Sequence, residues 1–280
     1  MTRELFDQFA PEYDTDAYNA HDAVAFALAS LLAYRDAPEV EAQTSAWGFS
    51  EVRPFDLRRG KDVDTQGYVA ANSRRMVVAF RGTESLPDWV TNVQAVKDPG
   101  PWGEVHEGFQ DAFLATAFVL GKTIGEIRGD RDIWITGHSL GGALAVLLAA
   151  TLAENNIDVA GLYTYAAPRV GNETFARRLN ESLEGKPNYR VVNEGDLVPH
   201  LPSELRFDHA GSRRILADGT LRDDNDTWRG FAEEIWGWIG RIGRLASLQI
   251  KPPHSLSHEE GYLPKLIALA QDSRANRVDP

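Results

Sequence analysis

The 280-residue chain contains no cysteine, so disulfide bonds, thiolate catalysis and cysteine-ligated zinc sites are excluded. It also lacks a cationic excess, because 29 Lys and Arg residues stand against 41 Asp and Glu residues and give a net charge of −12. Such a charge argues against binding to nucleic acid and against electrostatic attraction to anionic membrane surfaces. A neutral or zwitterionic lipid surface remains compatible with it.

Long apolar runs are missing as well. The longest run, 143–153, is too short to span a bilayer, and we expect no transmembrane segment. The start of the chain is charged and has no apolar h-region, so no signal peptide is visible. We therefore expect a cytoplasmic monomer, with secretion still open if a leader segment has been removed. Nothing in the sequence implies a metal ion or another cofactor.

Short apolar segments alternate with amphipathic ones along the rest of the chain. The expected strands are 65–71 and 75–80, which the turn-forming pair Asn72-Ser73 joins in a β-hairpin, and 161–166 and 189–193. The expected helices are 20–34, 106–128 and 175–183. This alternation predicts an α/β fold with a mostly parallel central sheet that helices cover on both faces. No repeat or linker is visible, so we expect one domain over 1–280, with 1–66 as an N-terminal arm and covering helix.

One further apolar strand pattern leads into a helix through Gly137-His138-Ser139-Leu140-Gly141. This stretch fits G-x-S-x-G, the nucleophile-elbow pattern of α/β-hydrolases. The corner forces the serine into strained backbone angles, and only glycine has room two residues before and after it. The start of the helix then points backbone N–H groups toward an oxyanion beside Ser139. A plain Gly-rich turn is the alternative, but the flanking strand and helix favour the elbow.

A serine nucleophile needs a histidine to take its proton and a carboxylate to orient that histidine. In α/β-hydrolases these follow the serine in the order acid, then histidine. Asp196 lies three residues beyond the strand that ends at Asn193, where an active-site loop is expected. Glu194 is an alternative acid, and an ordinary turn aspartate is the alternative interpretation of Asp196.

The histidine can be chosen by elimination from the seven in the chain. Five lie before the serine, within the elbow or close behind Asp196: His21, His106, His138, His200 and His209. His254 and His258 remain, just before a C-terminal helix. Ser257 and Glu260 resemble a capping box, which predicts that His258 lies in the first helical turn and His254 in the preceding loop. We favour His254, since a base on a loop is better placed to reach a neighbouring loop, and keep His258 as the alternative.

Six stretches carry longer motifs. They are F-R-G-T-E-S at 80–85, L-P-D-W-V-T-N at 86–92, V-H-E-G-F at 105–109, G-H-S-L-G-G at 137–142, Y-A-A-P-R-V-G-N at 165–172 and N-E-G-D-L-V-P-H-L-P at 193–202. Together they resemble the class 3 (fungal-type) lipase family, which has the α/β-hydrolase fold. The resemblance covers roughly residues 67–210.

The resemblance implies Ser139 as nucleophile and Asp196 as the orienting acid. It also implies an oxyanion hole formed by the hydroxyl and N–H of Thr83 and by the N–H of Leu140. The C-terminal histidine fits less closely. His254-Ser255-Leu256 matches the start of the family pattern, but the tyrosine that should follow arrives late; His258 has the better spacing but lacks the small and apolar residues after it.

The segment 85–99 is expected to form a short lid helix, since the resemblance places the family's lid there. Leu86, Trp89 and Val90 would lie on its apolar face, with 98–101 on the hinge side. A plain surface helix is the alternative. A second apolar stripe, within 228–250, is expected to be a core helix, or else to flank the acyl pocket.

These observations predict a serine ester hydrolase that acts on lipid esters through an acyl-enzyme, most specifically a triacylglycerol lipase at a lipid–water interface. A carboxylesterase or a phospholipase of the same fold is the alternative. A non-catalytic lipid-binding scaffold is a third, less favoured because the serine, the acid and a candidate histidine are all present.

Overall fold

The computed structural model describes residues 3–59, 63–83, 96–202, 205–217, 220–223 and 251–278. Within these ranges the main sheet has eight strands in the order β1-β2-β3-β6-β7-β8-β9-β10. The strands are β1 (Glu51–Arg59), β2 (Val63–Ala71), β3 (Arg75–Phe80), β6 (Asp132–His138), β7 (Gly161–Tyr165), β8 (Asn188–Asn193), β9 (Ser212–Ala217) and β10 (Thr220–Asp223). A separate hairpin joins β4 (Lys97–Gly100) to β5 (Gly103–His106).

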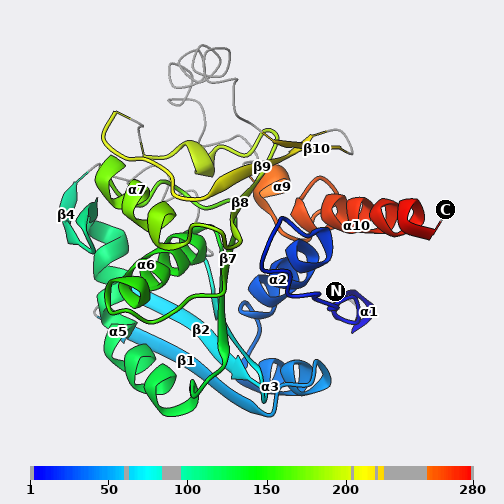
Figure 1. Cartoon of the computed structure of the whole chain (residues 1–280), viewed down its shortest axis with the longest axis horizontal. Helices are drawn as coiled ribbons and strands as arrows, with labels where there is room; N and C mark the ends of the chain where they lie inside the picture. The colour runs from blue at the N-terminus through cyan, green and yellow to red at the C-terminus, as the bar shows by residue number, and fades with distance from the viewer. Residues whose placement is uncertain are drawn as a thin grey trace.

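The helices surround this sheet (Figure 1). They are α1 (Arg3–Phe6), α2 (Ala20–Leu32), α3 (Ala37–Ala46), α5 (Glu107–Ile127), α6 (Leu140–Glu154), α7 (Glu173–Ser182), α9 (Lys251–His254) and α10 (Tyr262–Val278), with the 3₁₀ turn η1 (Val198–His200). Adjacent strands from β3 through β9 run parallel, whereas β1, β2 and β10 add antiparallel edges. The prediction of a mostly parallel α/β sheet is confirmed, as is the hairpin of β2 and β3.

The register of the central strands brings the candidate residues to one edge. In the parallel pair β3–β6, Phe80 lies opposite Gly137, and in the pair β6–β7, His138 lies opposite Tyr165. The carboxyl ends of neighbouring parallel strands therefore meet on the same side of the sheet, where sites of open α/β sheets form. The segments after β3, β6 and β8 all emerge there.

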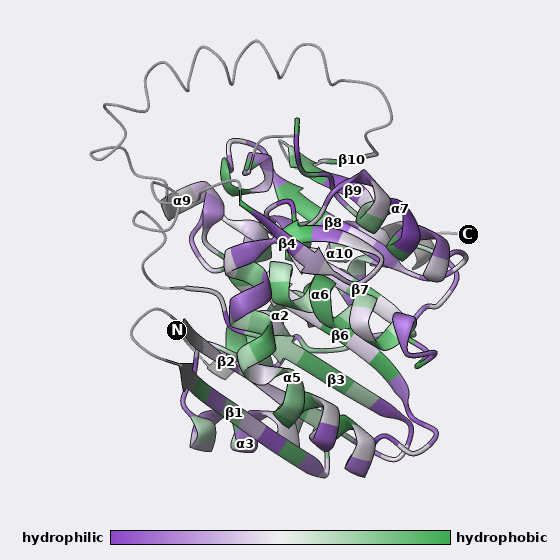
Figure 2. Cartoon of the chain, turned by 90° about the vertical axis from the view of Figure 1, so that its left-hand side faces the viewer, coloured by the Kyte–Doolittle hydropathy of each residue, from purple (hydrophilic) through white to green (hydrophobic). Residues whose placement is uncertain are grey.

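The sheet separates two hydrophobic cores. On β3, Met76, Val78 and Phe80 face the core that α5 and α6 build, whereas Val77 and Ala79 face the core that contains α2 and α10. A strand buried on both faces has to be apolar throughout, which explains its unbroken apolar sequence. Figure 2 shows the hydrophobic residues along β3 and α6 in the middle of the molecule.

Helix α2 covers the sheet as expected, but it is itself covered. Every residue from Asp22 to Leu32 is buried, because α10 lies against α2 on the side away from the sheet (Figure 1). The Ala-rich sequence is apolar around the whole helix, as a buried helix requires. The buried carboxylate of Asp22 accepts the N–H groups of Tyr13 and Asp14 at 2.7 and 2.8 Å, which ties the N-terminal arm to α2.

Two further expectations meet a different outcome, and two others cannot be compared with the structure. The N-terminal part is more than an arm and a helix, since α3 and the edge strand β1 also lie there. The segment expected as the hinge side of the lid contributes Lys97–Gly100 to the β4–β5 hairpin. Residues 84–95, which hold most of the expected lid, and the stripe within 228–250 lie outside the described residues.

Glycine has opposite roles in α5 and at the corner between β6 and α6. A Cβ added to Gly121, in the exposed middle of α5, would meet nothing within 4 Å. A Cβ added to Gly137 would overlap the backbone carbonyl of Gly141 and lie 2.8 Å from the N of Gly142. The corner therefore depends on a backbone contact that no other residue permits.

We expect Gly121→Ala to stabilise the protein by about 1 kcal/mol, because alanine loses less backbone freedom in a helix than glycine. Thermal unfolding should show a rise in Tm of about 2–4 °C. Gly137→Ala, the matched substitution at the corner, should instead destabilise the fold by several kcal/mol, on the order of the largest single-residue effects. A Gly137→Ala variant as stable as the parent chain would contradict this account of the corner.

Candidate active site

Ser139 lies at the corner between the end of β6 and the first residue of α6. Its φ of 59° and ψ of −128° are strained for a residue with a side chain. The corner is fixed on both sides, because the Ser139 N–H donates to the Tyr165 carbonyl at 2.9 Å and the Ser139 carbonyl accepts from the Gly142 N–H at 2.9 Å. The serine is buried, and its Oγ has no hydrogen-bond partner in the part of the chain that the structure describes.

Asp196 follows β8 and is completely enclosed by hydrogen-bond donors. Nδ1 of His254 lies 3.0 Å from both carboxylate oxygens, the Tyr262 hydroxyl donates to Oδ2 at 2.6 Å, and the Val198 N–H donates to Oδ1 at 3.0 Å. Burial alone would raise the pKa of this carboxyl. The His254 ring, the Tyr262 hydroxyl and the Val198 N–H together outweigh burial, so the pKa of Asp196 is held below its usual value and the group is a carboxylate at neutral pH.

The structure brings His254, and not His258, to the acid. His254 is the last residue of the short helix α9 and is buried, whereas His258 is exposed and its Nδ1 accepts the Glu260 N–H at 3.2 Å. No hydrogen bond joins His254 to Ser139 among the described residues. Catalytic hydrogen bonds are often long in the absence of substrate and shorten when substrate binds.

The predicted capping box before the last helix is wrong. Helix α10 begins at Tyr262, so His258 lies ahead of it and not in its first turn. The Oγ of Ser255, and not that of Ser257, shapes the local turn by accepting the N–H groups of Ser257 and His258, both at 3.3 Å. A side-chain hydrogen bond within a loop competed here with the helix-capping pattern that the sequence indicated.

Asn193 holds the segment that carries His254, a role that the sequence did not indicate. It is fully buried at the end of β8, and its Nδ2 donates to the carbonyls of Pro253 at 2.8 Å and Glu260 at 2.7 Å. Its Oδ1 accepts from the Lys265 ammonium at 2.6 Å. One side chain therefore anchors both ends of the turn between α9 and α10.

His138 has more contacts than its place as the variable residue of the elbow motif suggested. Its Nδ1 lies 2.9 Å from the Tyr34 hydroxyl, and its Nε2 lies 2.7 Å from the backbone carbonyl of His254. Burial, and after it the neighbouring His254, lower the pKa of His138 to about 3. His138 is therefore neutral at the pH values at which enzymes ordinarily work. These contacts could not be predicted from the sequence.

The segment after β3 touches the corner at Ser139. A Cβ added to Gly82 would lie 3.1 Å from the Ser139 Cβ and 2.6 Å from the His138 carbonyl oxygen. Thr83, the next residue, is half-buried, and Leu140 is the first residue of α6. The two predicted oxyanion donors thus belong to the two segments that meet at the serine. The predicted lid residues Leu86, Trp89 and Val90 lie outside the described residues.

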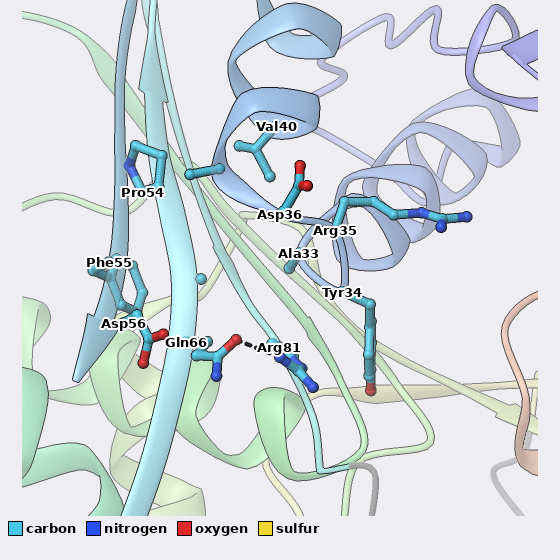
Figure 3. A pocket seen from close by; sticks show the side chains of 12 residues that line it. Ala33, Tyr34, Arg35, Asp36, Val40, Pro54, Phe55, Asp56, Gln66 and Arg81 are labelled. Atoms are coloured by element: carbon cyan, nitrogen blue, oxygen red, sulfur yellow. Dashed lines mark hydrogen bonds between the residues drawn. The ribbon is translucent and has the colours of Figure 1, made fainter. Parts of the chain in front are cut away.

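A cavity of about 510 Å³ lies beside this region (Figure 3). The turn between α2 and α3 forms one wall, and β1, β2 and Arg81 form the other. The Arg81 guanidinium donates to the Gln66 side chain and lies 5.7 Å from the centre of the Tyr34 ring. Tyr34 therefore contributes its ring to the cavity and its hydroxyl to His138. In the described part of the chain, no cluster of His, Asp or Glu could hold a metal ion.

Comparison with known proteins bears on the same region. The model of the lipase (class 3) family matches residues 77–206. Over these residues the chain is similar to the lipase (class 3) family. The match includes Ser139 and Asp196 but ends before His254, so the structure alone supplies the contact between the acid and this histidine.

Two curated relatives illustrate the similarity. A lipase of Rhizomucor miehei is 33% identical over 170 residues, which cover 56% of this chain and 46% of the relative. The secreted mono- and diacylglycerol lipase 1 of Fusarium solani is 35% identical over 166 residues, covering 56% of this chain and 49% of the relative. The chain thus spans about half the length of these class 3 lipases.

Solved lipase structures share the fold. The Rhizomucor miehei lipase–propeptide complex superimposes with a TM-score of 0.59 and 26% identity, over 76% of this chain and 74% of that one. A triacylglycerol lipase described as having a serine protease triad gives a TM-score of 0.60 and 25% identity, over 77% of this chain and 91% of that one. The α/β-hydrolase fold expected for this chain is confirmed. None of its described helices is long and apolar enough to cross a bilayer.

The buried, neutral His138 should make the stability of this protein depend on pH. Its pKa is about 3 in the folded protein, against an ordinary value of 6.5, so between these values the unfolded chain binds one more proton than the folded chain. Stability is therefore lost as the pH falls below about 6.5, and the loss reaches about 2 kcal/mol at pH 5.

Urea unfolding at pH 7, 6 and 5 should show this loss in the parent chain. The side chain in His138→Gln does not titrate. The slope of its unfolding free energy against pH should therefore lack the contribution of one bound proton, which is about 1.4 kcal/mol per pH unit. Equal slopes for the two chains would mean that His138 is not held neutral by burial.

Proposed function

We propose that the chain hydrolyses carboxylic esters of lipids through an acyl-enzyme on Ser139. The observation that carries the proposal is the hydrogen-bonded pair of Asp196 and His254 at the sheet edge from which the strained Ser139 emerges. A buried carboxylate that orients a histidine beside a serine on a nucleophile corner is the arrangement that acyl transfer needs. The match of residues 77–206 to the lipase (class 3) family model supports the same activity.

The roles of the three residues follow from the hydrogen bonds. Asp196 is a carboxylate and can only accept, so Nδ1 of His254 carries the proton between them and Nε2 is the free base. Nε2 takes the proton of Ser139 Oγ as the oxygen attacks the ester carbonyl. The carbonyl oxygen becomes an oxyanion, for which the N–H groups of Thr83 and Leu140, with the Thr83 hydroxyl, would be the donors.

The tetrahedral intermediate then collapses. The bond to the alcohol breaks as His254 gives its proton to the leaving oxygen, which produces an acyl-enzyme and a free alcohol. In the second half, His254 takes a proton from water, the hydroxide attacks the acyl carbon, and the proton returns to Ser139 as the acid leaves. No metal or cofactor takes part in this scheme.

The substrate that we favour is a triacylglycerol at a lipid–water interface. The class 3 relatives include enzymes named as lipases, as mono- and diacylglycerol lipases and, in Arabidopsis thaliana, as a phospholipase A1. A phospholipase or a carboxylesterase is therefore the second candidate. The net charge of −12 favours neutral or zwitterionic surfaces over anionic ones. A non-catalytic scaffold would have no use for the enclosed Asp196–His254 pair.

Three further features belong to the proposal. Of the segment 85–99 expected as the lid, the part before β4 would form it, with Leu86, Trp89 and Val90 facing the site in water and the lipid at an interface. The chain would act as a monomer with a single domain over 1–280. Two relatives are named as secreted enzymes, so an extracellular location competes with the cytoplasmic one expected from the sequence.

A serine-directed phosphonate ester tests the acyl-transfer chemistry. We expect mass spectrometry to find one adduct, on Ser139, and none in Ser139→Ala. His254→Ala should lower kcat by roughly 10⁴- to 10⁶-fold, as the loss of a triad base does. His258→Ala, the matched control four residues away, should remain within about twofold of the parent chain, because the side chain is exposed. A large loss in His258→Ala alone would make His258 the base, and the absence of an adduct would exclude the serine mechanism.

The interface proposal is tested by the rate as a function of substrate concentration. With a short-chain triacylglycerol, we expect the rate to rise steeply once the substrate exceeds its solubility, because the lid opens at an oil surface. A soluble ester of the same acid gives the reference curve. Saturation below the solubility limit, with no further rise, would favour a carboxylesterase. Faster fatty-acid release from phosphatidylcholine vesicles than from the triacylglycerol would favour a phospholipase.

A further inference from the structure

A single chain of hydrogen bonds runs behind Ser139 and joins segments that are distant in the sequence. The Gly82 N–H donates to the Tyr34 hydroxyl at 3.1 Å, that hydroxyl lies 2.9 Å from Nδ1 of His138, and Nε2 of His138 lies 2.7 Å from the His254 carbonyl. Its members come from the residues after α2, the loop after β3, the end of β6 and the end of α9. These hydrogen bonds thus connect the loop from Arg81 to Thr83, the oxyanion loop, to the backbone of the candidate base His254.

The direction of each hydrogen bond follows from chemistry. A backbone carbonyl can only accept, so Nε2 of His138 carries a proton and donates to His254. Burial keeps His138 neutral, which leaves Nδ1 without a proton and makes it an acceptor. The Tyr34 hydroxyl therefore donates to Nδ1, and its oxygen accepts the Gly82 N–H. The three hydrogen bonds therefore have only one consistent set of donors and acceptors.

We propose that His138, oriented by Tyr34, is a positioning residue that sets the distance between the base and the oxyanion loop during acyl transfer. The inference rests on the proposed function. Two hydrogen-bonding partners reach His254 itself: Asp196 fixes its ring through Nδ1, and His138 holds its backbone carbonyl, while Asn193 holds the neighbouring carbonyl of Pro253. Without the His138 contact, the backbone of His254 loses its own anchor, and we expect Nε2 to be less well placed to reach Ser139.

The Tyr34 hydroxyl also holds the oxyanion loop in place. The loop from Arg81 to Thr83 touches Ser139 through Gly82, whose added Cβ would lie 3.1 Å from the Ser139 Cβ. A hydroxyl that holds the Gly82 N–H therefore fixes the loop that carries the proposed oxyanion donor Thr83. Small displacements of groups near the reacting atoms are costly, because the near-attack geometry is lost.

The test compares two esters of one acid, ethyl butyrate and p-nitrophenyl butyrate. The ethoxide must be protonated by His254 as it leaves, whereas p-nitrophenolate leaves without a proton. In His138→Leu, which removes both hydrogen bonds, we expect kcat/KM for the ethyl ester to fall roughly 10- to 100-fold, within the range of a general acid's contribution. The fall in kcat/KM for the p-nitrophenyl ester should be smaller by about tenfold. The KM of the variant for both esters should stay within about twofold of the parent value.

Rescue and coupling give two further readouts. His138→Gln offers one donor and one acceptor side by side, so it should recover most of the ethyl ester activity. Tyr34→Phe should lower kcat for both esters about 3- to 10-fold, because it frees the oxyanion loop and His138 together. The double variant Tyr34→Phe/His138→Leu should lose less than the product of the single losses, since both residues act through one chain.

The control variants remove comparable buried hydrogen bonds that do not belong to the series through Tyr34 and His138. Tyr68→Phe takes away a buried hydroxyl that donates to the Ala29 carbonyl of α2 at 3.0 Å. Thr136→Val removes the hydroxyl that donates to the Phe26 carbonyl at 3.1 Å, two residues before His138 on the same strand. Both should keep the ratio of the two ester activities within about twofold of the parent chain. Phosphonate titration of the serine corrects every rate for the fraction of folded enzyme.

The outcomes separate the inference from the proposed function. Equal losses on the two esters in His138→Leu, or no recovery in His138→Gln, would mean that His138 only supports the fold, and the inference would be overturned. A parent chain that hydrolyses neither ester would overturn the proposed function and the inference together. A selective loss on the ethyl ester that His138→Gln reverses would establish the positioning role.

Discussion

The contact of backbone against backbone at the corner of Ser139 is the constraint on which the rest of the structure depends. Gly137 and Gly141 approach so closely that α6 must begin directly after β6, and a Cβ on Gly141 would overlap the Phe80 carbonyl at the end of β3. The strained serine, the start of α6 and the end of β3 are therefore fixed relative to one another. The position of the oxyanion loop, which follows β3, is therefore set by this contact.

The acid and the histidine depend on longer-range order. Asp196 emerges from β8, two strands away from β6, and reaches His254 from a segment more than fifty residues further along the chain. The parallel register aligns the strand ends, and Asn193 then clamps the turn after α9 through two carbonyls. The geometry of the site thus comes from the sheet edge first and from buried side-chain hydrogen bonds second.

The features that the sequence predicted well are the local ones. The elbow, the hairpin of β2 and β3 and the long helix α5 each depend on neighbouring residues, so spacing and turn chemistry reveal them. The partners of His138 could not be predicted, because Tyr34 is 104 residues away and meets it only in the folded chain. The burial of α2 was missed for a similar reason, since only α10 decides whether an apolar helix is covered. The turn before α10 was misjudged because Ser255, which no capping rule singles out, formed the hydrogen bonds.

The clamp by Asn193 has a consequence for how relatives of this chain can differ in length. Its two carbonyl partners, at Pro253 and Glu260, both lie after residue 250, as do Tyr262 and Lys265, which bond Asp196 and Asn193. The placement of His254 is therefore independent of how many residues connect β10 to α9. We therefore expect changes in the length of that connection to leave these hydrogen bonds, and with them the position of His254, unchanged.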